Sequence, residues 1–377
     1  MVASRLARLL DTLALQGIDV YLATHTADIH WLTGFSGVFD EEQAHLALVA
    51  ADHGPLFFTD TRYSGALARL DVQGRWRILD ERRPRPAYVA ERVKGLFGSR
   101  PQDRPLHIGI EGDLRLDSYR ALVTALDGIE GLAYRLVETS GLVRGLRACK
   151  DAREIEILKA AQEITDAAFG HMLGYLRPGL SERDAANELE TFMRRAGADA
   201  AAFPTIVATG PNSAVPHAVP GGRAIDRGDL VLMDFGARLE GYRSDMTRTV
   251  VMGAPSRQQR AMHEAARAAQ AAVMAMLRPG VSGLEAQALA DEAVAAHGFE
   301  GRLIHALGHG VGIDIHELPT LGPKVEAVLE EGNVVTVEPG VYLEGIGGVR
   351  IEDYGLVTSE GFEDFTRSPH DLVSIPL

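Results

Sequence analysis

Apolar residues in the first part of the chain alternate between helical and strand-like spacing. Leucines at positions 6, 9, 10, 13 and 15 form a helical stripe within residues 3–16, and an apolar run from Ile18 to Ala23 predicts a short buried strand. Further strand-like runs at 46–50, 55–59 and 106–111 alternate with helical patterns at 87–97 and 118–125. This alternation is typical of an α/β domain.

A second region begins at a strong helix start. Asp151 is a favoured N-cap residue, and Glu154 and Glu156 place negative charge in the first turns of an apolar-periodic helix that extends to about Met172. A chain of 377 residues also exceeds the size at which one core usually stops growing. We therefore predict an N-terminal α/β domain over residues 1–148 and a second domain over residues 149–377.

The second region contains the same unit twice. The string L-R-P-G occurs at 176–179 and again at 277–280, each time before a helix with a serine at its predicted N-cap, Ser181 or Ser282. Residues 227–236 likewise return in altered form as 331–340. A period near 100 residues is too long for a solenoid, so it predicts two half-domains related by a pseudo-twofold axis.

Acidic residues and a histidine occupy matching places in the two copies. Asp234 aligns with Glu338, Asp245 aligns with Glu352, and His217 corresponds to His316. If the half-domains face each other, the four carboxylates converge on one point. Carboxylates that lie side by side repel each other, so one must hold a proton unless a cation neutralises the group.

The first copy predicts a strand hairpin whose turn decides whether this cluster can form. A two-residue turn at Leu239-Glu240 places Asp234 directly across from Asp245, and one at Glu240-Gly241 makes them diagonal neighbours on the same face. A three-residue turn without a bulge would send the two side chains to opposite faces. As an alternative, Asp234 could merely cap a turn, but it follows the apolar run 230–233, where burying an uncompensated carboxylate is costly.

The ligand chemistry favours divalent metal ions. Oxygen-rich sites with one imidazole suit manganese, cobalt or zinc, and this number of carboxylates suits two ions. We assign the imidazole to His309, which lies between glycines that allow close approach of the backbone. His217 and His316 lie in proline-bounded loops, where they either flank a substrate or are ordinary surface histidines. The sequence assigns no function to the other histidines, including His305.

Composition limits the partners and the compartment. A net charge of −14 argues against nucleic acid and anionic membranes, whose recognition needs clustered Lys and Arg. Arg5, Arg8 and Asp11 interrupt the apolar N-terminal stretch, so it does not have the pattern of a signal peptide. No window has the roughly 20 apolar residues of a membrane span. With Cys149 as its single cysteine, the chain is expected in a reducing cytoplasm.

Several strings of the second region, taken in order, resemble a known family. They are F-P-T-I-V-A-T-G at 203–210, M-D-F-G at 233–236, S-D-M-T-R-T at 244–249, G-H-G-V-G at 308–312, H-E-L-P at 316–319, V-E-P-G at 337–340 and V-R-I-E-D at 349–353. Over about residues 150–360 the chain resembles the proline-specific peptidases of the creatinase and methionine aminopeptidase superfamily. The resemblance implies a catalytic pita-bread domain after a smaller creatinase-like α/β domain, two metal ions per subunit with manganese the first choice, and a homodimer.

The resemblance also implies a role for each site residue. Asp234 and Asp245 look like ligands of one metal, His309 and Glu338 like ligands of the other, with Asp245 and Glu352 as bridges. His217 and His316 look like the pair that binds substrate and stabilises the tetrahedral intermediate, and Arg350 resembles an arginine that organises the site. Glu338 would take a proton from the attacking water and pass it toward the prolyl nitrogen.

The expected substrates are small peptides with proline at the second position. Family dipeptidases often place an arginine four residues beyond the second histidine, where it can hold a free carboxylate, but this chain has Thr320 there. We therefore expect an Xaa-Pro aminopeptidase, with an Xaa-Pro dipeptidase (prolidase) as the alternative. A non-catalytic peptide-binding protein of the same fold is a more remote alternative, disfavoured because all five ligand positions are intact.

Overall fold

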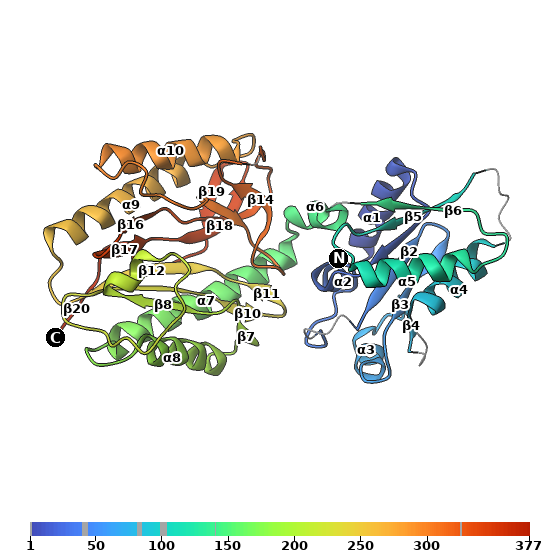
Figure 1. The fold of residues 1–377 in the computed structure, drawn as a ribbon, viewed down its shortest axis with the longest axis horizontal. Helices are drawn as coiled ribbons and strands as arrows, with labels where there is room; N and C mark the ends of the chain where they lie inside the picture. Colours follow the sequence, from blue (N-terminus) through green and yellow to red (C-terminus); the bar gives the residue numbers. More distant parts are fainter. Residues whose placement is uncertain (1, 40–43, 81–84, 99–103, 140, 325) are drawn as a thin grey trace. The chain divides into compact units, whose positions relative to one another are not determined.

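The computed structural model describes residues 2–39, 44–80, 85–98, 104–139, 141–324 and 326–377. The chain divides into two units, Met1–Leu146 and Arg147–Leu377, and each has its own hydrophobic core (Figure 1). Within the described residues, no helix is both long enough and apolar enough to cross a bilayer.

The first unit is a sheet with helices, in the strand order β4-β3-β2-β1-β5-β6. Its elements are α1 (Val2–Gln16), β1 (Val20–Ala23), α2 (Thr26–Thr33), β2 (Leu46–Ala50), β3 (His53–Phe58), α3 (Ser64–Leu70), β4 (Arg77–Leu79), α4 (Arg85–Phe97), β5 (Leu106–Ile110), α5 (Leu116–Asp127) and β6 (Tyr134–Glu138), and α6 (Leu142–Ala148) crosses the boundary. The predicted α/β alternation is confirmed. The sequence patterns missed α2 because its residues 27–33 are all buried, which removes the one-sided apolar stripe.

The second unit places strands between two pairs of helices (Figure 1). Its helices are α7 (Ala152–Tyr175), α8 (Glu182–Arg195), α9 (Arg257–Met276) and α10 (Gly283–Ala296), and η1 (Gly210–Ala214) is a 3-10 turn. Its strands are β7 (Ala200–Ala201), β8 (Ile206–Thr209), β9 (Leu230–Phe235), β10 (Ala237–Leu239), β11 (Tyr242–Arg243), β12 (Met246–Met252), β13 (Gly308–Gly310), β14 (Glu317–Leu321), β15 (Val334–Val337), β16 (Gly340–Leu343), β17 (Gly347–Arg350), β18 (Asp353–Thr358), β19 (Gly361–Asp364) and β20 (Ser374–Ile375).

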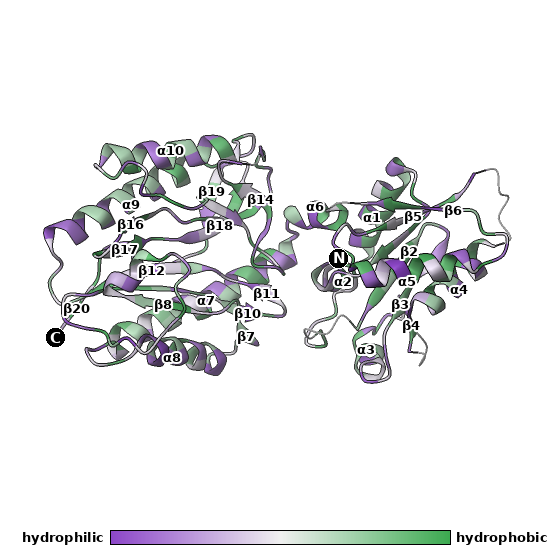
Figure 2. Cartoon of the chain, viewed as in Figure 1, coloured by the Kyte–Doolittle hydropathy of each residue, from purple (hydrophilic) through white to green (hydrophobic). Residues whose placement is uncertain are grey.

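The strands of the second unit form two larger sheets. One has the order β20-β12-β9-β8 and the other the order β14-β13-β15-β18-β19. In Figure 2, β8 carries mainly hydrophobic residues, whereas α8 carries many hydrophilic ones. This distribution follows burial, because every residue of β8 is buried, as is every residue of β9 and of β12.

The duplication in sequence is also a duplication in structure. Helices α8 and α10 both begin with a serine capping box, at Ser181 and Ser282. In the turn before each serine, a glycine adopts the left-handed conformation, with φ of 92° at Gly179 and 91° at Gly280. The predicted start of α7 is confirmed, because Asp151 caps that helix through a capping box.

Candidate metal centre

The first hairpin has the register that places two aspartates on one face. Asp234 in β9 pairs with Thr247 in β12, which makes Asp245 its diagonal neighbour. The turn between β10 and β11 consists of Glu240 and Gly241, both at positive φ, 48° and 84°. Two such residues form a type I′ turn, whose twist matches that of paired strands. The structure thus adopts the second of the two predicted registers.

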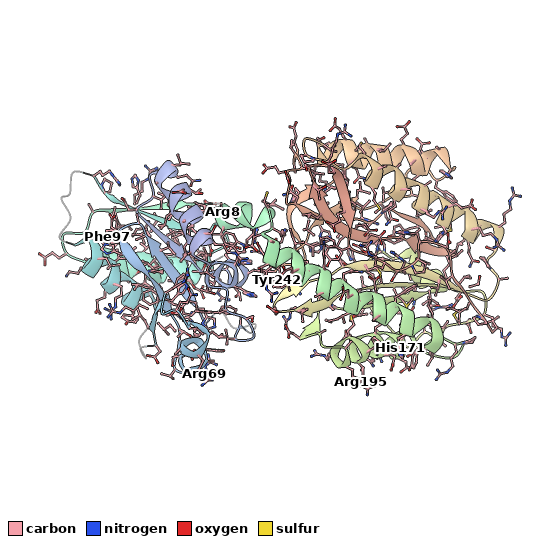
Figure 3. The ribbon with its side chains drawn as sticks, turned by 180° about the vertical axis from the view of Figure 1, so that it is seen from behind. Arg8, Arg69, Phe97, His171, Arg195 and Tyr242 are labelled. Atoms are coloured by element: carbon pink, nitrogen blue, oxygen red, sulfur yellow. The ribbon has the colours of Figure 1, made fainter. Side chains whose placement is uncertain are left out.

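Helix α7 holds this hairpin through several polar contacts, including the pair of Arg153 with Glu240 in the turn. The hydroxyl of Tyr242 donates to Oε1 of Glu154 at 3.0 Å, and both side chains are buried. Tyr242 is labelled in Figure 3, where it lies close to the first turns of the helix. The helix start that the sequence reveals at Asp151 therefore also fixes the turn that sets the aspartate register.

The second copy brings its glutamates to the same place. Val337 pairs with Asp353 in the β15–β18 ladder, so Glu338 and Glu352 are the next residues outward on the two strands. The amide N–H of Glu352 donates to the carbonyl of Thr247 at 3.1 Å, and the Thr247 hydroxyl donates to Oε2 of Glu352 at 2.6 Å. The two half-domains therefore meet where their acidic residues lie.

His309 completes the cluster from β13. Its Nε2 lies 3.6 Å from Oδ2 of Asp245 and 3.4 Å from Oε1 of Glu338. The ligand atoms of Asp245, His309 and Glu352 all lie within 4.8 Å of one another. Nδ1 of His309 is 3.0 Å from the carbonyl of Gly310 and must donate to it, so Nε2 presents its lone pair to the carboxylates.

The glycines around His309 are required by strand packing. A Cβ at Gly308 would lie 2.2 Å from the carbonyl oxygen of Thr336, and a Cβ at Gly310 would lie 2.2 Å from that of Leu318. Both oxygens belong to backbone that cannot move aside cheaply. The G-H-G string therefore lets β13 approach its two neighbours closely enough to bring His309 to the carboxylates.

Asp234 is held on one side and open on the other. Arg350 donates from Nη2 to Oδ2 of Asp234, and the same guanidinium donates to the hydroxyls of Thr247 at 3.0 Å and Tyr342 at 2.8 Å. Oδ1 of Asp234 is buried and has no hydrogen-bond partner among the described residues. A buried carboxylate oxygen left in this way is costly unless a cation approaches it.

Burial and mutual repulsion disfavour charge on the carboxylates. Burial, and then the nearby Asp234 and Glu338, raise the pKa of Asp245 well above its ordinary value. Burial followed by Asp245 does the same to the pKa of Glu352. Burial also raises the pKa of Asp234, against the opposing charge of Arg350, and raises that of Glu338 to about 8.

The same surroundings keep the histidine neutral. Burial, followed by the charge of His316, lowers the pKa of His309 to about 3. Four carboxylates and one neutral imidazole are a donor set for hard or borderline divalent metals. Together with the unpartnered Oδ1 of Asp234, this set fits divalent ions. These ions would balance the negative charge of the carboxylates, which the single positive charge of Arg350 does not offset.

The two loop histidines lie at the accessible side of the cluster. His217 and His316 are both exposed, and both lie close enough to Asp234 to lower its pKa. The rings of His316 and His309 meet edge to face, with centroids 4.3 Å apart. The structure therefore brings all the sequence-predicted site residues together, with the carboxylates at the base and His217 and His316 toward solvent.

Sequence reasoning missed part of the site. Nε2 of His305 lies 2.9 Å from the Tyr342 hydroxyl, which also accepts from Arg350, and Nδ1 of His305 lies 3.9 Å from Oε2 of Glu338. Burial, and then Arg350, lower the pKa of His305 to about 4. No helix or strand spacing marks His305, so only the tertiary structure places it beside Glu338.

A second acidic group lies behind the first. Ligand atoms of Asp353, Asp364 and His370 also lie within 4.8 Å of one another. Arg248 already occupies this group, because its Nη2 donates to Oδ1 of Asp353 at 2.6 Å. We therefore assign this group a structural role, which ties β12 to the strand that follows Glu352.

Comparison with known proteins gives the family. The model of metallopeptidase family M24 matches residues 156–359, and the model of the creatinase/prolidase N-terminal domain matches residues 5–149. An Xaa-Pro dipeptidase of Pyrococcus furiosus is 40% identical over 260 residues, which cover 65% of this chain and 75% of that protein.

Solved structures agree with this assignment across the whole chain. The Xaa-Pro dipeptidase from Bacillus anthracis is 38% identical, with a TM-score of 0.90 and coverage of 100% of both chains. The X-Pro aminopeptidase from Thermotoga maritima is 30% identical, with a TM-score of 0.85 and coverage of 98% of this chain and 100% of that one. The predicted fold, a creatinase-like α/β domain followed by a pita-bread domain, is thereby confirmed.

Proposed function

Because the chain belongs to metallopeptidase family M24, we propose that it hydrolyses the peptide bond between an N-terminal residue and a following proline, and that dipeptides are its main substrates. The observation that carries the proposal is the convergence of Asp234, Asp245, His309, Glu338 and Glu352 from both half-domains on one buried point. Such a centre has no evident structural use, because its like charges push the half-domains apart.

We assign two divalent ions to this centre, with manganese as the first choice and cobalt or zinc as alternatives. Asp234 and Asp245 would hold one ion, His309 and Glu338 the other, with Asp245 and Glu352 shared. When bound, the ions supply Lewis acidity that polarises the scissile carbonyl and lowers the pKa of the attacking water. A homodimer and a cytoplasmic location are further parts of the proposal.

The chain's own residues would bind the peptide and move the proton. Glu338 takes the proton of the attacking water on a carboxylate oxygen and delivers it to the prolyl nitrogen, which must be protonated to leave. His316 donates toward the oxygen on which negative charge develops, and His217 contacts the bound peptide. Arg350 keeps Asp234 oriented and offsets its charge. Its Nη1 also donates to the carbonyl of Pro216 at 3.3 Å, which holds the loop that carries His217.

Dipeptidase activity is favoured over the aminopeptidase activity expected from Thr320. Relatives with this name include the Pyrococcus furiosus protein and the Bacillus anthracis structure. The missing arginine at position 320 then means that another cation holds the free carboxylate of the dipeptide. An Xaa-Pro aminopeptidase is the second candidate, supported by Thr320 and by the similar Thermotoga maritima structure.

Hydrolysis of Leu-Pro, Leu-Pro-Ala and Leu-Ala, with manganese, cobalt and zinc in turn, tests the proposal. We expect Leu-Pro to have the highest kcat/KM, by at least about tenfold, since one charge-assisted hydrogen bond to the carboxylate contributes roughly 1.5–3 kcal/mol. A preference for Leu-Pro-Ala would establish the aminopeptidase. No cleavage of either proline peptide, with substoichiometric metal, would leave only a binding protein.

A further inference from the structure

A buried ion network lies directly beside one of the loop histidines. Glu317 follows His316 in the chain, and its carboxylate is buried between two cations from the start of the second unit. Nη2 of Arg147 contacts Oε1 of Glu317 and lies 2.9 Å from Oδ2 of Asp314, while Nζ of Lys150 lies 3.2 Å from Oε2 of Glu317. The proposed site does not use any of these charged groups.

The network fixes the loop that precedes His316. Oε1 of Glu317 accepts from the amide N–H of Asp314 at 2.9 Å, and a Cβ at Gly312 would lie 2.5 Å from Oε2 of Glu317. From the other side, Nε of Arg243 donates to the carbonyl of Ile313 at 2.8 Å. Residues 312–315 are therefore held on both sides, and His316 comes next.

Stability alone gives a weak reason for this arrangement. Burial on its own would raise the pKa of Glu317, but Arg147 and Lys150 lower it to about 2, so the carboxylate is ionised at neutral pH. The cost of removing buried ions from water often equals or exceeds their mutual attraction, and apolar replacements are frequently as stable. Such a network instead fixes one geometry for the groups it holds. Here it fixes the loop 312–315, which leads directly to the exposed His316 beside the metal centre.

We propose that Glu317, held by Arg147 and Lys150, is a positioning residue that fixes the His316 ring against His309 and toward the substrate. This inference rests on the proposed function, in which His316 contacts the peptide. Glu317 itself does not touch the reacting atoms. Its contribution to the rate passes through His316, so it must disappear when the imidazole is absent.

A double-mutant cycle measures this dependence. For manganese-loaded protein and Leu-Pro, we expect Glu317→Gln to lower kcat/KM by about tenfold or more, but by less than about twofold in the His316→Ala background. Metal content should stay the same in all four proteins. An equal loss in both backgrounds would overturn the proposal, because a purely structural defect does not depend on His316.

Crystal structures of the metal-free proteins give a readout that needs no activity. In the unaltered chain the His316 and His309 ring centroids are 4.3 Å apart, and we expect the His316 ring to be displaced in Glu317→Gln. An unmoved ring would refute the positioning role even if the protein proved inactive on proline peptides. Absence of Leu-Pro cleavage by the unaltered protein would instead count against the proposed function.

Two further variants guard against misfolding and general damage. Arg147→Lys keeps the positive charge but removes Nη2, the guanidinium atom that contacts both Glu317 and Asp314, so it should show the same dependence on His316. If Glu317→Gln does not fold, this variant carries the test. Glu363→Gln is the matched control, because it breaks an exposed pair with Lys159 and should leave kcat/KM unchanged.

Discussion

Loading the metal-free protein with manganese should release protons, because the site carboxylates hold them in the absence of metal. Glu338 has a pKa raised to about 8, so at pH 7 roughly nine in ten molecules carry that proton. Burial, and then the neighbouring carboxylates, also raise the pKa values of Asp245 and Glu352 well above their ordinary range. His309, with a pKa of about 3, has no proton to give.

The expected release follows from these values. Glu338 alone contributes about 0.9 proton at pH 7, and the raised pKa values of Asp245 and Glu352 can only add to this release. The sign for stability follows too. Because Glu338 holds its proton more tightly in the folded metal-free state than in the unfolded chain, its contribution to stability is fully present below about pH 4.5 and is lost as the pH rises through about 8.

The size of this stability loss can be estimated for Glu338. A shift from 4.5 to about 8 corresponds to a free energy on the order of 5 kcal/mol between those pH values. Bound metal replaces the protons, so the loaded protein should not show this loss. Thermal unfolding at pH 6 and pH 8, with and without manganese, measures the difference.

Calorimetric titration in buffers of different ionisation enthalpy counts the protons. The slope of the observed heat against buffer enthalpy gives the number released, and Glu338→Gln should release about one fewer, since that group no longer titrates. Release of less than about half a proton at pH 7 would refute the reasoning, because it would mean that the carboxylates are charged without metal.

Three other outcomes follow from the packing and charges of the second unit. Arg248→Met removes the buried partner of Asp353, and urea unfolding should show a loss of roughly 3–5 kcal/mol. Gly310→Ala should abolish metal binding in a dialysis assay, because its Cβ meets backbone at 2.2 Å, whereas Gly174→Ala on open helix surface should bind metal normally. Glu317, with a pKa lowered from 4.5 to about 2, contributes stability above pH 4.5 that is lost as the pH falls toward 2, so Glu317→Gln should flatten that part of an acid-unfolding curve.

The sequence predicted the site best where local rules apply. The repeated glycine turns and serine caps depend on backbone conformation, and both copies show them at the expected residues. The hairpin left two registers open, since either two-residue turn keeps Asp234 and Asp245 on one face. The structure adopts the turn at Glu240-Gly241, in which both residues have positive φ. Glycine at the second position takes such an angle without strain, which favours this turn over the one at Leu239-Glu240.

Other parts of the site depend on contacts that no local pattern contains. Thr247 joins the half-domains by accepting the Glu352 amide on its carbonyl and donating its hydroxyl to the Glu352 carboxylate, across more than a hundred residues of sequence. His305 and Tyr342 reach Glu338 and Arg350 in the same way. The fully buried α2 shows the converse limit, because a helix without a polar face has no periodicity to detect.

The position of metal in a crystal tests the central claim most directly. Crystals soaked in manganese, measured at the manganese absorption edge, should show two anomalous peaks within bonding distance of the predicted ligands, Asp234, Asp245, His309, Glu338 and Glu352. Peaks located instead at Asp353, Asp364 and His370, or no ordered metal at all, would contradict the account.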